Sequence, residues 1–350
     1  FQSGNTEICD TFVSEEGVFV LYHLINNNLD YDLFIQKADY DGNLIDGLIE
    51  PLYNNENNQM DGQFAACSNG QVLVVWKEIN ASRQVSLYSQ KLTLTGTFVW
   101  SDKKLLAQDI NIRDFRLNPD QSGGAYISWE KESGENIISI CYNQMDMNGN
   151  LIHGSQGIQI YENTKIQTLS TVSLNNGLYF LINKYDDIVS DTLIYINALY
   201  PEPKLIAENN VNLYPNTNSD FIVFDDFQKV FSISYFYQNK ILSVDMQDSL
   251  QFTLLLEGKN LAIKKINTNL FCVINYDYLN LITYWISKEG EILYTQEIPH
   301  NMIVNNDDLV DIFRKETFII EDDFYVNLVV SNMNYQTNET LYHSVFLKTN

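Results

Sequence analysis

The sequence predicts an all-β protein, a seven-bladed β-propeller of antiparallel four-stranded blades. One reason is a repeat anchored at residues 17, 70, 123, 177, 229, 269 and 323, with differences of 53, 53, 54, 52, 40 and 54. Each repeat also holds about four short runs rich in Tyr, Phe, Ile, Val and Thr, which favour strands. No stretch keeps apolar residues at helical spacing for three turns. A single unit of this length cannot bury its apolar face, whereas a ring of units can.

The clearest unit surrounds the third anchor. It opens with a turn at Ser122-Gly123-Gly124 and continues with an apolar strand, Ala125 to Trp129. A polar loop separates this strand from the next one, Ile137 to Met145. The turn Asp146-Met147-Asn148-Gly149 then leads into a third extended piece, Asn150 to His153. Gly and Asn between two extended runs indicate an antiparallel hairpin, because such a turn needs positive φ.

The other units repeat this order. Before each anchor lies a run that we expect to line the central channel: Ile8 to Val13, Gln63 to Cys67, Phe115 to Leu117, Leu169 to Leu174, Phe221 to Phe224, Leu261 to Ile266 and Phe318 to Ile320. After it lies an apolar strand sandwiched between neighbouring blades: Val18 to Tyr22, Gln71 to Trp76, Leu178 to Ile182, Val230 to Tyr235, Leu270 to Ile274 and Phe324 to Val330. A further strand follows in several units: Leu33 to Ala38, Val85 to Leu92 and Leu341 to Leu347.

Short pieces after the turns complete the early units, namely Asn43 to Ile45 and Thr97 to Trp100. The Asn- and Pro-containing stretch Ala207 to Asp220 is predicted to be a loop. Because the last unit ends soon after its third strand, the sequence leaves open how the ring closes. We nevertheless expect one domain over residues 1–350, since the units of a ring share their cores.

Charge and length exclude several classes of function. The 350 residues carry a net charge of -24, and the isoelectric point is near 4.3. Such acidity argues against nucleic acid and against an anionic membrane surface. It predicts a solvated surface, with attraction to a basic partner or to Ca²⁺ as the alternative. No apolar run approaches the ~20 residues of a membrane helix, so we expect no direct membrane insertion.

The four cysteines, Cys9, Cys67, Cys141 and Cys272, stand alone without a CxxC pair. Isolated cysteines in strands usually act as small buried hydrophobes. Their even number permits disulfides, but the sequence cannot pair them. The sequence starts at Phe1 rather than at Met. We therefore expect a removed signal peptide or a trimmed chain, and targeting information is missing.

Acidic motifs offer two candidate cation sites. Asp39-Tyr40-Asp41-Gly42 and Asp146-Met147-Asn148-Gly149 look like the start of a calcium loop, but they lack its Glu at position 12 and its flanking helices. We interpret both as turns. If the acidic doublets converged, they could hold Ca²⁺ or act as paired carboxylates in glycoside hydrolysis. Their offsets within the repeats differ, which favours solvated loop charge: Asp186-Asp187, Asp225-Asp226, Asp307-Asp308 and Asp322-Asp323.

No catalytic motif is present. The histidines show no zinc-binding spacing: His23, His153, His300 and His343. There is no GxSxG elbow, no phosphate-cradling glycine loop and no nucleophilic Cys-His signature. The arginines are too few for the carboxylate clamp of sialidase-like propellers, because two of the four share one strand region: Arg83, Arg113, Arg116 and Arg314. The sequence thus predicts that the chain is not an enzyme, with no catalytic, cofactor-binding or metal-binding residues and no cofactor.

Aromatic residues offer a surface of another kind. Trp76 and Trp129 occupy equivalent strand positions and are expected to pack between blades. Tyrosines in the predicted loops could instead form a carbohydrate- or protein-binding surface: Tyr53, Tyr214, Tyr237 and Tyr335.

The repeat pattern combines GG, an apolar run, W-x-[DE], Y-x-Q-K and x-x-G-x-apolar-apolar. It is clearest in Gly123-Gly124 with Trp129-Glu130, in Val75 to Glu78 with Ser89 to Lys91, and in Asp146 to Leu151. This pattern resembles a repeat in secreted and envelope proteins of Bacteroidota, often linked to type IX secretion or gliding. The resemblance covers about half of the chain and implies a propeller outside the cytoplasm, periplasmic or at the cell surface. It implies no activity.

From these observations we expect a non-catalytic interaction protein of the cell envelope. The resemblance favours a protein partner such as an outer-membrane type IX secretion translocon. A glycan-binding or glycan-cleaving propeller is the alternative, and a Ca²⁺-dependent adhesin fragment is a third hypothesis. The sequence names neither the partner nor the docking face.

Overall fold

The computed structural model describes these residues: 5–14, 17–25, 31–39, 43–45, 52–53, 55–67, 70–109, 111–120, 122–134, 137–163, 166–174, 177–185, 191–197, 204–211, 219–224, 229–234, 240–245, 249–256, 259–266, 268–276, 280–299, 309–320, 323–334 and 339–348. Side-chain surroundings are described mainly within residues 9–163 and 268–297. By its internal contacts the chain divides into two compact units. The first comprises residues 1–164 with 175–178, and the second comprises 165–174 with 179–350.

The first unit contains three antiparallel four-stranded sheets in chain order. The first sheet is β1 (Asn5–Ser14), β2 (Gly17–Ile25), β3 (Tyr31–Ala38) and β4 (Leu44–Ile45). The second is β5 (Asn58–Cys67), β6 (Gln71–Ile79), β7 (Val85–Thr93) and β8 (Lys104–Asp109). The third is β9 (Ile112–Pro119), β10 (Ala125–Gly134), β11 (Ile137–Met145) and β12 (Ile158–Asn163).

The described strands of the second unit continue the series, with β14 starting at the boundary between the units. The fourth sheet is β13 (Ile166–Leu174), β14 (Gly177–Tyr185), β15 (Asp191–Asn197) and β16 (Lys204–Val211). The fifth is β17 (Ser219–Phe224), β18 (Lys229–Ser234), β19 (Lys240–Asp245) and β20 (Ser249–Leu255). They are followed by β21 (Lys259–Lys265), β22 (Leu270–Tyr276), β23 (Asn280–Ser287) and β24 (Ile292–Pro299), and by β25 (Leu309–Ile320), β26 (Asp323–Asn334) and β27 (Glu339–Lys348).

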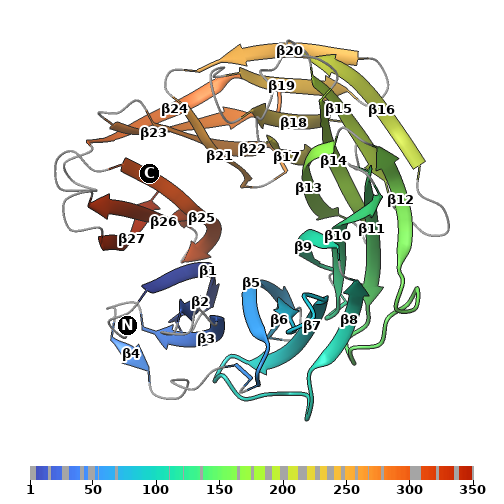
Figure 1. Ribbon diagram of the computed structural model, residues 1–350. Helices are drawn as coiled ribbons and strands as arrows, with labels where there is room; N and C mark the ends of the chain where they lie inside the picture. The colour runs from blue at the N-terminus through green and yellow to red at the C-terminus, as the bar shows by residue number, and fades with distance from the viewer. Residues whose placement is uncertain are drawn as a thin grey trace. The chain divides into compact units, whose positions relative to one another are not determined.

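Within each unit, successive sheets contact each other through their first strands. In the first unit β5 touches β1 and β9, and in the second unit β17 touches β13 and β21. Figure 1 shows the strands of each sheet lying side by side in chain order. The predicted all-β class and antiparallel four-stranded sheets are therefore confirmed, except that the last described sheet, β25 to β27, has three strands.

The second strand of a sheet carries core residues on both faces. In β6, Val72, Val74 and Trp76 join a core shared with the first sheet. The intervening Leu73 and Val75 join another core, shared with the third sheet. Successive side chains of a strand point to opposite faces, so an uninterrupted apolar run fits a strand between two neighbours.

Two lysines of the repeat link neighbouring sheets. Lys37 Nζ on β3 donates a hydrogen bond to Leu94 O in the second sheet, at 2.9 Å. Lys91 Nζ on β7 donates to Met147 O at 3.0 Å and to Gly123 O at 2.7 Å, both in the third sheet. We call these contacts the lysine bridges. They give the Q-K part of the repeat a structural role, because each bridge ties one sheet to a turn of the next.

The turns predicted after the third strands are present. In the turn after β11, Asp146 Oδ1 accepts hydrogen bonds from the backbone N–H groups of Asn148 and Asn150, at 2.9 and 2.8 Å. Its Oδ2 accepts from Asn150 Nδ2 at 2.9 Å. Gly149 has a φ of 87°, a conformation that favours glycine. The Asp39 carboxylate makes the same contacts with Asn43, so both carboxylates are engaged by their own turns.

Three predicted segments differ from the structure. Beyond their turns, Thr97 to Trp100 and Asn150 to His153 form only isolated bridges, through Phe98 and Leu151. The outer strands β8 and β12 begin several residues later, because bends carry the chain past the expected positions. The predicted loop Ala207 to Asp220 is wrong at both ends, since β16 extends to Val211 and β17 begins at Ser219. The residues between them lie outside the described ranges.

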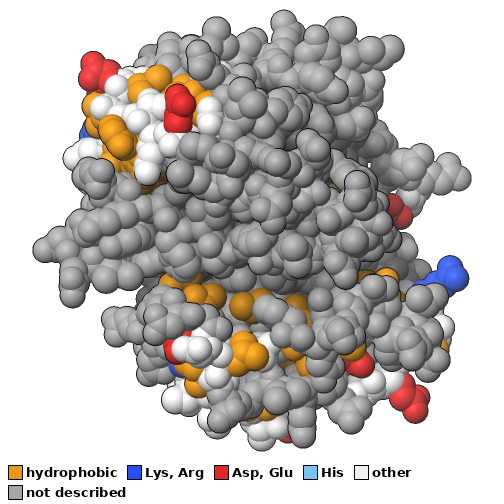
Figure 2. Space-filling model, turned by 90° about the vertical axis from the view of Figure 1, so that its left-hand side faces the viewer, with side chains coloured by type: hydrophobic (Ala, Val, Ile, Leu, Met, Phe, Trp, Pro, Cys, Tyr) orange, Lys and Arg blue, Asp and Glu red, His pale blue; other side chains and the backbone are white. Residues whose placement is uncertain are grey.

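Acidic side chains lie scattered among polar and apolar ones on the face seen in Figure 2. Most of the acidic doublets lie outside the described residues, except that Asp323 begins β26. Among the residues that the structure describes, no helix is long and apolar enough to span a membrane. None of the four cysteines forms a disulfide, and Cys9 is the one that is only partly buried.

Candidate functional site

Polar side chains connect the first strands of the first unit. The Asp10 carboxylate on β1 accepts a hydrogen bond from the backbone N–H of Phe64 on β5, at 2.6 Å. One sheet further on, Gln63 Oε1 accepts from the Leu117 N–H of β9 at 3.0 Å, and its Nε2 donates to Phe115 O at 2.9 Å. These bonds satisfy backbone groups between the sheets and hold the first strands in register.

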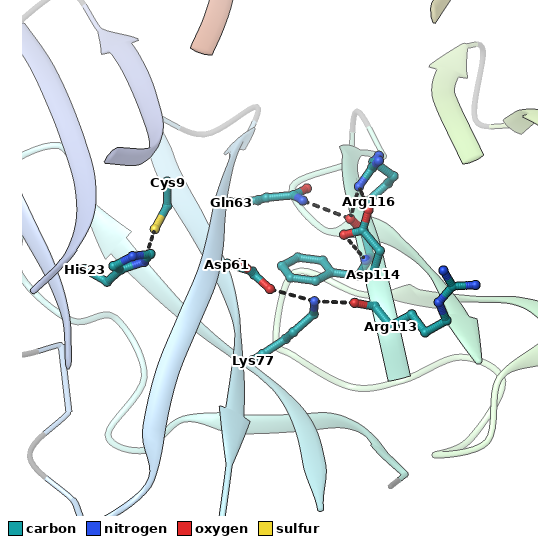
Figure 3. A network of polar contacts seen from close by, with 9 residues as sticks. Cys9, His23, Asp61, Gln63, Lys77, Arg113, Asp114 and Arg116 are labelled. Carbon is teal, nitrogen blue, oxygen red and sulfur yellow. Dashed lines mark hydrogen bonds and ion pairs between the residues drawn. The ribbon is translucent and has the colours of Figure 1, made fainter. Parts of the chain in front are cut away.

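A buried lysine forms the centre of the candidate site. Lys77 on β6 is 6% exposed. Its Nζ donates to Asp61 Oδ2 at 2.7 Å and to Arg113 O at 2.6 Å. Figure 3 shows this ammonium group between the two acceptors. The centroid of the Phe115 ring lies 6.0 Å from Lys77 Nζ. The lysine thus couples β5, β6 and β9 through one charge.

Irregular backbone presents the charged groups of this site. Asp61 lies in a bulge of β5, between the pairs Met60↔Lys77 and Gln63↔Val75, and has a φ of 54°. Arg113 lies in a bulge of β9, where Asp114 pairs with Glu130 but Ile112 pairs with Lys131. Bulges re-aim side chains and are frequent next to functional sites.

Two arginine–carboxylate pairs lie on and beside β9. Arg116 Nη1 donates to Asp114 Oδ2 at 2.6 Å, with side-chain exposures of 37% and 41%. Arg113 Nε lies 3.7 Å from Glu132 Oε1, and both side chains are nearly half exposed. The two arginines therefore each face a carboxylate of their own sheet. This arrangement differs from a clamp in which several arginines converge on one ligand carboxylate.

A buried carboxyl group lies directly beside these pairs. Glu130 on β10 is 5% exposed and is the cross-strand partner of Asp114. Burial raises the pKa of Glu130, and the charge of Asp114 raises it further against the opposing effects of Arg113, Arg116 and Lys77. A carboxyl group with a raised pKa beside another carboxyl group is an arrangement that acid–base chemistry uses. We call the set Asp61, Lys77, Arg113, Asp114, Arg116 and Glu130 the first-strand cluster.

One further pair of reactive side chains lies on the first sheet. Cys9 Sγ is 3.3 Å from His23 Nδ1, and Figure 3 shows the two side chains pointing toward each other. The sequence shows no Cys-His signature, because Cys9 and His23 are fourteen positions apart. The bulge in β1 between Ile8 and Asp10 brings Cys9 beside His23 of β2. The strand pairing was predictable, but the bulge was not.

The other sequence candidates are placed as follows. Tyr53 packs against Trp76, with ring centroids 5.7 Å apart. The other three loop tyrosines and His300 lie outside the described residues, as do the side chains of Arg314 and His343. His153 contacts the Tyr142 ring edge-on at 5.5 Å. Within the described part of the chain, no three side chains among His, Cys, Asp and Glu gather closely enough to hold a metal ion.

Comparison with known proteins identifies the class of fold. No protein-family model matches the chain, and a search of curated proteins finds no match. Among solved structures, the chain is similar to Raptor from Chaetomium thermophilum, with 13% identity and a TM-score of 0.53 over 99% of this chain and 28% of that one. It is also similar to prolyl oligopeptidase B from Galerina marginata, with 9% identity and a TM-score of 0.55 over 97% of this chain and 51% of the enzyme. The chain thus spans about half of that enzyme or less than a third of Raptor.

These likenesses establish the fold alone, and they correct one prediction. The prediction that the chain is not an enzyme is contradicted, because a prolyl oligopeptidase is among the proteins that share its fold. The missing sequence motifs do not exclude catalysis, since the structure assembles Cys9–His23 and Asp114–Glu130 from residues without any such motif. The chain is more weakly similar to BamB from Moraxella catarrhalis, with 10% identity and a TM-score of 0.45 over 97% of this chain and 82% of that one. This likeness is too weak to support a conclusion.

Proposed function

We propose that this chain is a single-domain, seven-bladed β-propeller that docks on a protein partner in the cell envelope. The partner would be a protein such as an outer-membrane type IX secretion translocon, on the periplasmic side or at the cell surface. The resemblance of the repeat to Bacteroidota envelope proteins supports the location. The sheets that follow one another along the chain, in contact through their first strands within each unit, support the propeller.

The exposed arginine–carboxylate pairs of the first-strand cluster carry the docking proposal. An exposed ion pair contributes only about 0–1 kcal/mol to a folded protein. Arg113 Nε and Glu132 Oε1 are 3.7 Å apart, and both side chains are about half exposed. Breaking this ion pair to form new pairs with charged groups of a partner therefore costs little. Arginine is also among the residues most enriched at the energetic centres of interfaces. Charged groups on rigid strands therefore offer a partner fixed points of attachment.

An affinity capture experiment tests the proposal. The tagged protein is used to recover partners from its native envelope, followed by mass spectrometry. We expect the double substitution Arg113→Ala and Arg116→Ala to reduce partner recovery at least tenfold, about 1.4 kcal/mol. Arg83→Ala is the matched control, because Arg83 is an exposed arginine in the turn between β6 and β7. Equal recovery by the double variant and the control would refute docking through the cluster.

A second candidate function is cleavage of a glycan, supported by the Asp114–Glu130 pair. Glycoside hydrolysis needs one protonated and one ionised carboxyl group close together. Residues directly opposite on antiparallel strands have Cβ atoms about 5 Å apart, and Glu130 is the member with the raised pKa. Release of reducing ends from a panel of polysaccharides tests this function, with Glu130→Gln and Asp114→Asn expected to abolish it. No release by the unchanged protein would exclude it.

A further inference from the structure

A row of aromatic rings lies on the face of β6 opposite Lys77. Phe98 stacks on Tyr53 with centroids 5.8 Å apart and an interplanar angle of 9°. Tyr53 stacks on Trp76 at 5.7 Å and 21°, and Tyr88 continues the row at 6.2 Å from Trp76. The phenol oxygen of Tyr53 accepts a hydrogen bond from Gln90 Nε2 at 2.7 Å, which fixes its ring. The row is therefore rigid.

A buried carboxylate lies beside these rings. Glu78 on β6 is 2% exposed. It accepts hydrogen bonds from Trp76 Nε1 at 3.1 Å and from the side-chain amides of Asn55 and Asn57 at 3.3 and 3.2 Å. A carboxylate buried this deeply is strongly destabilising unless a cation pairs with it.

The chain supplies that cation itself. Lys103 Nζ forms an ion pair with Glu78 and lies 4.1 Å from the centroid of Tyr88 and 5.2 Å from that of Tyr53. Two aromatic faces and a carboxylate around one ammonium group form the arrangement by which proteins recognise ammonium ligands. We call Tyr53, Tyr88 and Glu78 the ammonium cage.

Two features distinguish Lys103 from the rest of this site. It comes from the non-strand segment 97–103, whereas Glu78 and Tyr88 lie on central strands, and its side chain is 21% exposed. The site also keeps an unused acceptor. Gln59, the cross-strand partner of Glu78, is fully buried, and its Oε1 has no hydrogen-bond partner. Buried acceptors are rarely left unpaired, so this one indicates a donor that Lys103 does not supply.

We propose that the ammonium cage binds a lysine side chain of a protein partner and that Lys103 fills the cage in the unbound chain. This inference rests on the proposed docking function, since it names the group that the partner inserts. The net charge of -24 favours a basic partner. A partner lysine can make the contacts that Lys103 makes, so the exchange requires the partly exposed Lys103 side chain to leave the cage.

The first test measures binding of a blocked lysine, Nα-acetyl-lysine methylamide, by calorimetry. The Lys103→Ala variant, whose cage is empty, should bind it at least tenfold more tightly than the unchanged protein. The neighbouring substitution Lys104→Ala is the control and should bind like the unchanged protein. The Nε-acetylated ligand, which carries no charge, should not bind any of them. A folded Lys103→Ala variant that binds no more tightly than the control overturns the proposal.

A second test needs no substitution and covers the case in which Lys103→Ala does not fold. The unchanged protein is acetylated with acetic anhydride, and the rate at each lysine is followed by mass spectrometry. Lys103 should react more slowly than Lys104. Tetramethylammonium, which cannot be acetylated, should displace Lys103 and raise its rate several-fold without affecting Lys104. An unchanged Lys103 rate up to molar concentrations overturns the proposal.

The outcomes also separate this inference from the docking function. Recovery of a partner together with no binding of blocked lysine refutes the cage alone. Binding of blocked lysine without any recovered partner refutes the docking function and leaves an ammonium site of the isolated chain, which overturns the assignment to a partner lysine.

Discussion

Replacing Lys91 with methionine should measure the strength of a lysine bridge. Lys91 is 1% exposed and donates to two backbone carbonyls of the third sheet, Gly123 O and Met147 O. Methionine keeps the apolar stem but removes the donor, so both acceptors lose their partner. A buried polar group left without a hydrogen bond costs about 1–3 kcal/mol.

The burial of the ammonium group works in the opposite direction. Its desolvation costs several kcal/mol, and the methionine variant recovers this cost. Two orphaned carbonyls together cost about 2–6 kcal/mol, and the recovered desolvation lowers the expected net loss in the free energy of unfolding to about 1–3 kcal/mol. The centroid of the Trp100 ring lies 6.0 Å from Lys91 Nζ, so tryptophan fluorescence during urea unfolding reports on this region.

Lys37→Met is the matched control. Lys37 occupies the same repeat position, is only half-buried and donates to Leu94 O. Its replacement should cost about 1 kcal/mol, the net value of one ordinary hydrogen bond. If Lys91→Met is no less stable than Lys37→Met, the desolvation cost cancels the bridge and the reasoning fails.

Three further predictions concern single sites. The pKa of Glu130 is raised in the folded state, so its contribution to stability is complete below the ordinary pKa of 4.5 and is lost as the pH rises through the higher folded-state pKa. In urea titrations between pH 4 and pH 8, Glu130→Gln should therefore gain stability relative to the unchanged protein. A difference in stability that stays constant with pH would contradict this. Gly157→Ala should cost about 1–3 kcal/mol more than Gly154→Ala, because both have positive φ but only the Cβ at 157 would meet Trp129, at 2.5 Å; equal thermal shifts would rule out the steric cause. In the native state a thiol reagent should label Cys9 first, since the other cysteines are buried. Cys9→Ser should remove the fast phase of labelling; a fast phase that persists in this variant would contradict the prediction.

The strands were predictable where apolar runs and turn residues coincide. The burial of β6 on both faces follows from its unbroken apolar run, and the turn at Asp146 follows from Gly149. Outer strands such as β8 were missed because their pairing is decided by how far the preceding bend carries the chain. Sequence spacing does not encode that distance.

The candidate sites were less predictable than the fold. The Cys9–His23 contact and the position of Arg113 both depend on bulges, which add one residue to a strand without a clear sequence signal. The ammonium cage joins Tyr53, Glu78 and Lys103 from three separate segments. The one available signal for Glu130 was a charged residue at the end of an apolar strand, and it was interpreted as part of the repeat only.

The lysine bridges place unequal demands on the two sheets that they join. The donor must be a long cationic side chain, but the acceptor is a backbone carbonyl, which every amino acid provides. A receiving turn can therefore change its side chains freely without losing the contact, provided that its backbone keeps its path. Gln144 occupies the equivalent donor position in the third sheet. It donates instead to Asp120, beside the end of β9 in the same sheet, so this position holds no lysine bridge. Units of this chain can thus drift apart in sequence while the spacing that sets the backbone path is retained.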